Sequence, residues 1–290
     1  MSTIDGIGKG HDRRARAWVF VIIAAAVIMY IPTLGYLRDK WIEDAQYSLG
    51  FLVPLVSGYF VWKKWPDTAG LTKSPSIWGL VLILIGLLLH LSGTLLDLSG
   101  PSGVSIIIVL IGGCLYFHGK GLLKLMAFPL AYMVFMIPVP GGLIDRVGLP
   151  MQLLASGSTA HILSFLGLDV SRAGIQISVE GYQFEVAPAC SGMSSLVALV
   201  GVSAVFAYLT RLRPALKWTL FALSLPIALA ANIVRITTIA LVGYQWGWEN
   251  AMHIYHDWSS PILFLVAIIL LFVINWGFEW LSARRTTASS

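Results

Sequence analysis

Apolar runs long enough to cross a lipid bilayer recur along the whole sequence and restrict it to membrane folds. The hydrocarbon core of a bilayer is about 30 Å thick, which a helix of roughly 20 apolar residues can cross. Backbone inside that core must satisfy its own hydrogen bonds, so it is helical or forms a closed barrel. The sequence predicts an all-α polytopic protein in one integral-membrane domain, 1–290, with about eight spans, near 17–37, 47–63, 77–97, 101–118, 122–138, 191–210, 215–245 and 258–281.

The composition agrees with this class and excludes others. Of the 290 residues, 57% are hydrophobic and only 11% are charged, whereas charged residues make up about a quarter of a soluble domain. There is no room for a large soluble domain, and we expect the net charge of +5 to orient the chain in a membrane rather than to bind nucleic acid. The first apolar run lacks a convincing cleavage site after it, so we expect a retained first helix.

Lysines and arginines concentrate in alternate loops, which predicts the orientation because basic residues near span ends stay in the cytoplasm. Fourteen fall on the side of the N-terminus, namely Lys9, Arg13, Arg14, Arg16, Lys63, Lys64, Lys73, Lys120, Lys124, Arg211, Arg213, Lys217, Arg284 and Arg285. Four fall on the other side, namely Arg38, Lys40, Arg146 and Arg172. We therefore expect cytoplasmic tails at both ends, 1–16 and 282–290.

The segment between the fifth and sixth spans differs from the rest. Residues 143–167 mix polar and apolar side chains, which favours a helix lying in the outer membrane interface. Residues 173–187 alternate on either side of Glu180-Gly181, which predicts a short β-hairpin. This hairpin would lead the chain to the sixth span.

Cys190 follows this hairpin, in the stretch VAPACSGMSS (186–195). Ser191 could cap the helix that follows, and Gly192 would let another part of the chain approach the backbone. A thiol at the positive end of a helix is favoured as the thiolate, which is the nucleophilic form. Cys190 is therefore a candidate nucleophile, and the alternative is a small buried apolar side chain.

The predicted topology places one basic residue, Arg235, well inside a span, and every other lysine and arginine in a loop, in a tail or near the end of a span. Even lenient insertion scales assign such an arginine a cost of about 2.5 kcal/mol, so we expect it to face a partner or a wet cavity. Asn232 precedes it by three residues and shares its helix face. The alternative is a structural ion pair, for example with Asp97.

His253 and His256 lie with Asp257 at the outer start of the last span. A histidine can transfer protons near neutral pH, so either is a candidate general acid or base. The three side chains could instead bind a metal or remain solvated. Together with Cys190 and Arg235, they bring a thiol, a guanidinium and an imidazole to one side of the membrane, as a cysteine acyl-transfer enzyme requires.

At these residues the sequence resembles the exosortases, members of the exosortase/archaeosortase family of membrane cysteine transpeptidases. The similar segments are YSLGFLVPL (47–55), FPLAYMVFMIPVP (128–140), EVAPACSGMSSL (185–196), NIVRI (232–236) and HDWSSPILF (256–264). The resemblance assigns the catalytic Cys, Arg and His to Cys190, Arg235 and His256. We expect Asn232, Ser191, Gly192 and His253 to support them or to bind substrate.

The resemblance implies an enzyme of the bacterial inner membrane with its active site at the periplasmic face. Its substrates would be exported proteins with a C-terminal sorting signal of the PEP-CTERM type, cleaved through a cysteine thioester and transferred to a lipid or glycan acceptor. It implies contact with membrane lipid and no nucleic acid, metal or organic cofactor.

Two other functions remain open from the residues themselves. One is a transporter in which Arg235 binds an anion, although no inverted repeat is visible. The other is a metal-dependent enzyme acting on lipid-linked sugar, with His253, His256 and Asp257 around the metal.

Overall fold

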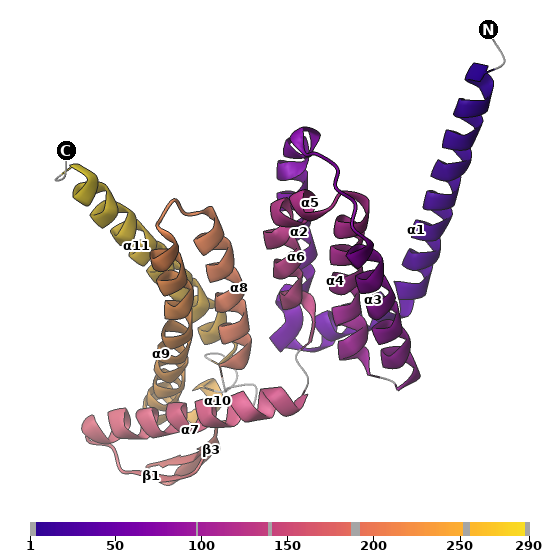
Figure 1. Cartoon of the computed structure of the whole chain (residues 1–290). Helices are drawn as coiled ribbons and strands as arrows, with labels where there is room; N and C mark the ends of the chain where they lie inside the picture. Colours follow the sequence, from indigo (N-terminus) through magenta and orange to yellow (C-terminus); the bar gives the residue numbers. More distant parts are fainter. Residues whose placement is uncertain (1–3, 97, 139–140, 187–191, 252–255, 288–290) are drawn as a thin grey trace. The chain divides into compact units, whose positions relative to one another are not determined.

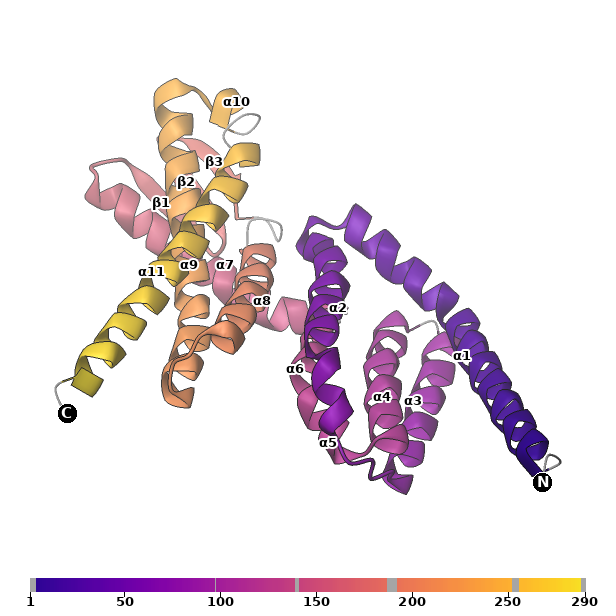
Figure 2. The same ribbon diagram turned by 90° about the horizontal axis from the view of Figure 1, so that it is seen from above.

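The computed structural model describes residues 4–96, 98–138, 141–186, 192–251 and 256–287, and Figures 1 and 2 show it from two directions. The chain forms two compact units, each described here by itself. The first contains Met1–Glu43 and Tyr59–Ile137, and the second contains Asp44–Gly58 and Pro138–Ser290.

The first unit is helical and is built around a tight helix pair. Its elements are α1 (Ile4–Glu43), the second half of α2 (Leu52–Lys64), η2 (Trp65–Gly70), α3 (Ile77–Leu95), α4 (Ser99–Phe117), α5 (Lys120–Leu125), α6 (Ala127–Tyr132) and η3 (Met133–Met136). Both figures show α3 and α4 side by side. Gly79, Gly86 and Gly93 recur at seven-residue spacing on α3, and a Cβ on each would overlap α4 or the loop before it. Small residues let the two backbones approach closely.

The predicted fifth span, 122–138, is divided into α5, α6 and η3 instead of forming one helix. Pro129 has no N–H to donate to the carbonyl of Leu125, four residues earlier. That carbonyl oxygen accepts a 2.9 Å hydrogen bond from Lys64 Nζ instead. The second predicted span, 47–63, is likewise divided into η1 (Ala45–Phe51) and α2.

The second unit contains the segments that carry the sequence motifs. Its elements are η1, the first half of α2, α7 (Gly141–Phe165), β1 (Val170–Ala173), β2 (Gln176–Val179), β3 (Tyr182–Glu185), α8 (Met193–Leu209), α9 (Pro214–Trp246), α10 (Trp248–Asn250) and α11 (His256–Thr287). Helices α8, α9 and α11 agree with the last three predicted spans to within a few residues, apart from the longer C-terminal end of α11. Helix α7 agrees with the predicted helix 143–167.

The predicted hairpin is confirmed, but the sheet has a third strand. Strands β2 and β3 pair antiparallel around Glu180 and Gly181, whose φ angles of 48° and 82° suit a two-residue hairpin turn. Strand β1 pairs with β2 through a second turn at Gly174, where φ is 65°. The fold is therefore mostly helical rather than all-α. Strand β1 was not predicted because its polar residues Ser171 and Arg172 interrupt the alternation of apolar side chains.

Four helices within the described parts of the chain are long and apolar enough to cross a membrane: Ile77–Leu95, Gly100–Phe117, Pro214–Trp246 and Pro261–Ser282. Two shorter apolar helical segments, Ala127–Met136 and Met193–Leu209, accompany them. These helices give a polytopic membrane protein, and the count of eight crossings stays a prediction.

In the second unit, α7 lies crosswise to α8 and α9, with the sheet beside it (Figure 1). A buried cluster joins α7, the sheet and α9. It contains Ala155 and Leu163 from α7, Ile177 from β2, and Ile236 and Ala240 from α9. This packing anchors α9 immediately beside Arg235.

Candidate functional site

The start of α8 is held against α9 through a glycine. Gly192 precedes α8 and has a φ of 79°, in the left-handed region. A Cβ at this position would lie 2.7 Å from Cγ of Asn232, closer than side chains can pack. Both the backbone conformation and the contact require glycine. The segment two residues after Cys190 is therefore in direct contact with Asn232.

Arg235 lies one turn further along α9 and contacts α11. Its side chain is 7% exposed, and that of Asn232 is 4% exposed. Arg235 Nε donates a 3.3 Å hydrogen bond to Oγ of Ser259, which is 2% exposed. Because a buried guanidinium needs polar partners, this hydroxyl supports the charge. It also ties α9 to the first turn of α11.

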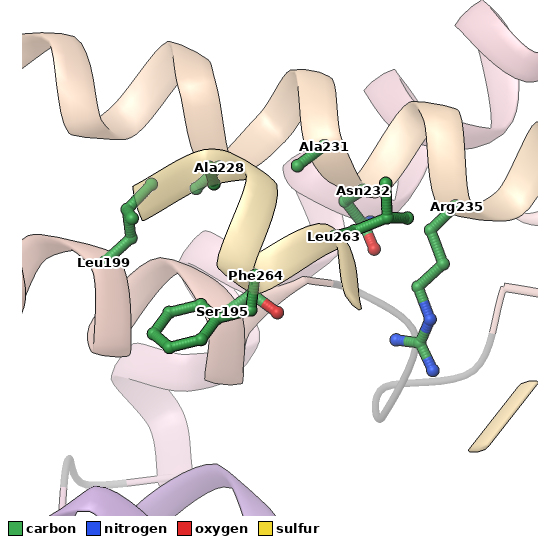
Figure 3. A pocket seen from close by; sticks show the side chains of 9 residues that line it. Ser195, Leu199, Ala228, Ala231, Asn232, Arg235, Leu263 and Phe264 are labelled. Atoms are coloured by element: carbon green, nitrogen blue, oxygen red, sulfur yellow. The ribbon is translucent and has the colours of Figure 1, made fainter. Parts of the chain in front are cut away.

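A narrow pocket opens beside these residues, between α8, α9 and α11. It is lined by Ser195, Leu199, Ala228, Ala231, Asn232, Arg235, Leu263, Phe264 and Ala267. Figure 3 shows Asn232 and Arg235 projecting from the same side of α9 with Leu263 beside them, and Leu199 toward the opposite end of the pocket. Its water-accessible volume is about 10 Å³, about enough for one water molecule.

The predicted site residues divide into those that the structure describes and those that it does not. Asn232, Arg235 and Gly192 are brought together as described above. Cys190, Ser191 and His253 lie outside the described residues. His256 is the first residue of α11, and its side chain lies outside the described part, as does that of Asp257.

The two structural alternatives for these residues, an ion pair and a metal site, both involve residues outside the described part of the chain. Asp97, the ion-pair partner considered for Arg235, lies outside the described residues. Among the described residues there is no group of three or more His, Cys, Asp or Glu side chains that could hold a metal. The candidate metal trio of His253, His256 and Asp257 falls outside that search.

Sequence reasoning missed Ser259 and Ser195. Ser259 follows His256 by three residues in HDWSS, a spacing that places both in the first turn of a helix. That spacing was the available signal, but the hydrogen bond to Arg235 needed the fold. Ser195 follows Gly192 by three residues, about one helix turn, and lines the pocket.

Chemically, the site is a buried guanidinium at the junction of three segments that are distant in the sequence. A fixed positive charge in a region of low dielectric can stabilise a thiolate or a developing oxyanion far better than it could in water.

One comparison with known proteins identifies a family for this chain. Residues 41–273 match a family model described as Transmembrane exosortase (Exosortase_EpsH). No curated protein and no solved structure matches the chain. The family match includes the segments around Gly192, Asn232, Arg235 and Ser259. Because it covers most of the sequence, this chain belongs to the transmembrane exosortase family and is a multi-pass membrane protein.

Proposed function

We propose that this protein is a cysteine transpeptidase that cleaves the C-terminal sorting signal of exported proteins of the PEP-CTERM type. The cleaved substrate would form a thioester intermediate with Cys190, and its acyl group would then pass to a lipid or glycan acceptor. Membership of the exosortase family supports this class of reaction.

One observation carries the assignment to these residues. Described residues close in sequence to Cys190 and His256 contact α9 at Asn232 and at Arg235. Gly192, two residues after Cys190, touches Asn232. Arg235, on the same face of α9, is hydrogen-bonded to Ser259, in the helix turn that begins with His256. These two links between the described parts of the three motifs support a shared site.

Each residue has a distinct role in the proposed reaction. The Cys190 thiolate attacks the scissile carbonyl, forming a C–S bond as the C–N bond breaks. Arg235 stabilises the thiolate or the oxyanion. His256 donates a proton to the leaving amine. A nucleophile of the acceptor then attacks the thioester carbonyl, the C–S bond breaks to release the Cys190 thiolate, and the proton of the nucleophile passes to His256, which lost its own proton to the leaving amine.

The packing of α7 supports a site near the membrane surface. Several large apolar side chains of α7 are exposed, including Leu149, Leu154 and Phe165, as expected of a helix lying in the interface. Helix α9 has 33 residues and is about 50 Å long, longer than the hydrocarbon core. Because α7 crosses α9 beside Arg235, the guanidinium would lie at the depth of the interface, where a sorting signal leaves the membrane.

The test follows maturation of the host's own exported substrates. A strain lacking this protein is complemented with wild type, Cys190→Ala, Arg235→Ala or His256→Ala at matched membrane levels, and a tagged substrate is followed by gel mobility. We expect full maturation with wild type and a loss of at least about 100-fold in rate with each variant. Ser224→Ala serves as the control, because Ser224 is buried in α9 and bonds within its own helix.

Other outcomes would favour other functions. Undiminished maturation with Cys190→Ala would exclude the thiol mechanism and favour an anion transporter using Arg235. Loss of maturation on chelation, with Cys190→Ala active, would favour the metal-dependent alternative around His253 and His256.

A further inference from the structure

We propose that Ser259 is a positioning residue, which fixes the orientation of the Arg235 guanidinium by accepting the hydrogen of Nε. This inference rests on the function proposed above, because it assigns Ser259 a part in that reaction. It concerns how Arg235 is aimed.

The hydrogen bond is well placed to control the guanidinium. Nε of Arg235 lies 3.3 Å from Oγ of Ser259, and both side chains are more than nine-tenths buried. A guanidinium is planar, with its donors in a rigid fork. Fixing Nε therefore fixes the plane and the direction of the two terminal nitrogens. Those nitrogens carry the N–H groups that the proposed reaction directs at the thiolate or oxyanion.

Ser259 also connects Arg235 to the segment of the proposed acid. Ser259 and His256 lie three residues apart in the first turn of α11, so their Cα positions move together when the helix end moves. The bond thereby holds Arg235 at a set distance from the backbone of His256. A displacement of about 1 Å between reacting groups can cost about 100-fold in rate, so such a link has functional weight.

Other buried hydroxyls in this unit behave differently. Ser203 Oγ donates to the carbonyl of Val200, and Ser224 Oγ donates to that of Phe221, each within its own helix. Ser259 instead joins two helices through a charged side chain. This difference makes Ser224→Ala a matched control, since it removes a buried hydroxyl of the same size from α9.

The experiment measures maturation rates by pulse-chase in the complemented strain, with the tagged substrate used above. We expect Ser259→Ala to slow maturation by about 5- to 10-fold, in line with the loss of one hydrogen bond of typical strength. Ser259→Thr keeps the hydroxyl and should retain a rate within about 2-fold of wild type, as should Ser224→Ala. Membrane level and melting temperature in detergent are measured for every variant.

A second background separates positioning from packing. Arg235→Lys keeps the charge but has no Nε–H for Ser259 to accept. Ser259→Ala should therefore slow Arg235→Lys no further, whereas a merely structural serine would slow both backgrounds equally.

The inference is overturned if Ser259→Ala matures substrate as fast as Ser224→Ala, or if its effect is the same in the Arg235→Lys background. Failure of the proposed function looks different, since Cys190→Ala would then mature substrate as wild type does.

Discussion

At the scale of single residues, the structure explains why glycine occupies position 192 of the Cys-Ser-Gly motif. Its φ of 79° lies in a region that side chains with a Cβ rarely adopt, and Asn232 occupies the space that a Cβ would need. The glycine of Cys-Ser-Gly therefore sets how closely the segment after Cys190 approaches α9.

We predict that Gly192→Ala preserves the membrane level but lowers substrate maturation by about 10- to 100-fold. The left-handed conformation costs an alanine about 1–2 kcal/mol, and relief of the contact with Asn232 shifts the start of α8 relative to Arg235. Pulse-chase maturation and melting in detergent measure the two effects. Gly277→Ala on α11 is the control, because nothing lies within 4 Å of its Cβ position. Wild-type maturation by Gly192→Ala would contradict the contact.

Arg235 marks the limit of residue-level prediction. Its charge inside a span required a polar partner, and the sequence allowed Asp97 as a candidate. The structure places the hydroxyl of Ser259 on Nε, a contact that depends on how α9 and α11 are rotated toward each other.

At the scale of elements, apolar patterning predicted most of the long helices and turn chemistry predicted the hairpin, but neither predicted where an apolar run is interrupted. Glu180-Gly181 predicted the β2–β3 turn, because a two-residue hairpin with positive φ selects such residues. The apolar run 122–138 predicted one span, but Pro129 and the amine of Lys64 divide it. The helix pair α3–α4 offers a test at this scale.

We predict that Gly79→Ala lowers the stability of the α3–α4 pair by about 1–3 kcal/mol, the usual cost of overpacking. The new Cβ would overlap the backbone of Tyr116, which cannot move without displacing α4. Thermal unfolding in detergent measures the change. Gly113→Ala on α4 is the matched control, since its Cβ position has nothing within 4 Å. Equal melting temperatures for the two variants would refute close packing at Gly79.

At the scale of the whole molecule, the distribution of charge predicts the orientation in the membrane. Basic residues gather in the alternate loops of the predicted topology, which predicts that the segment from β1 to Cys190 lies on the side opposite the termini. The sheet, α7 and the start of α8 would then share the outer face with the site, where exported substrates arrive.

We predict that alkaline phosphatase, which is active only outside the cytoplasm, is inactive when fused after Ser290 and active when inserted between Gly174 and Ile175. The two-residue turn at Gly174 joins β1 to β2, so an insertion there leaves both strands intact. Enzyme activity in intact cells, normalised to fusion protein, measures the orientation. The reverse pattern would place the site in the cytoplasm and exclude exported substrates.

The sequence by itself determined the membrane class, the main apolar helices, the β-hairpin and the segments that carry the exosortase motifs. These follow from hydropathy, turn chemistry and short motifs, which are local properties of the chain. Only the tertiary structure decided that Gly192 meets Asn232, that Ser259 holds Arg235, and that α7 crosses α9 beside that arginine. Such contacts depend on how helices rotate and pack, which no local pattern specifies.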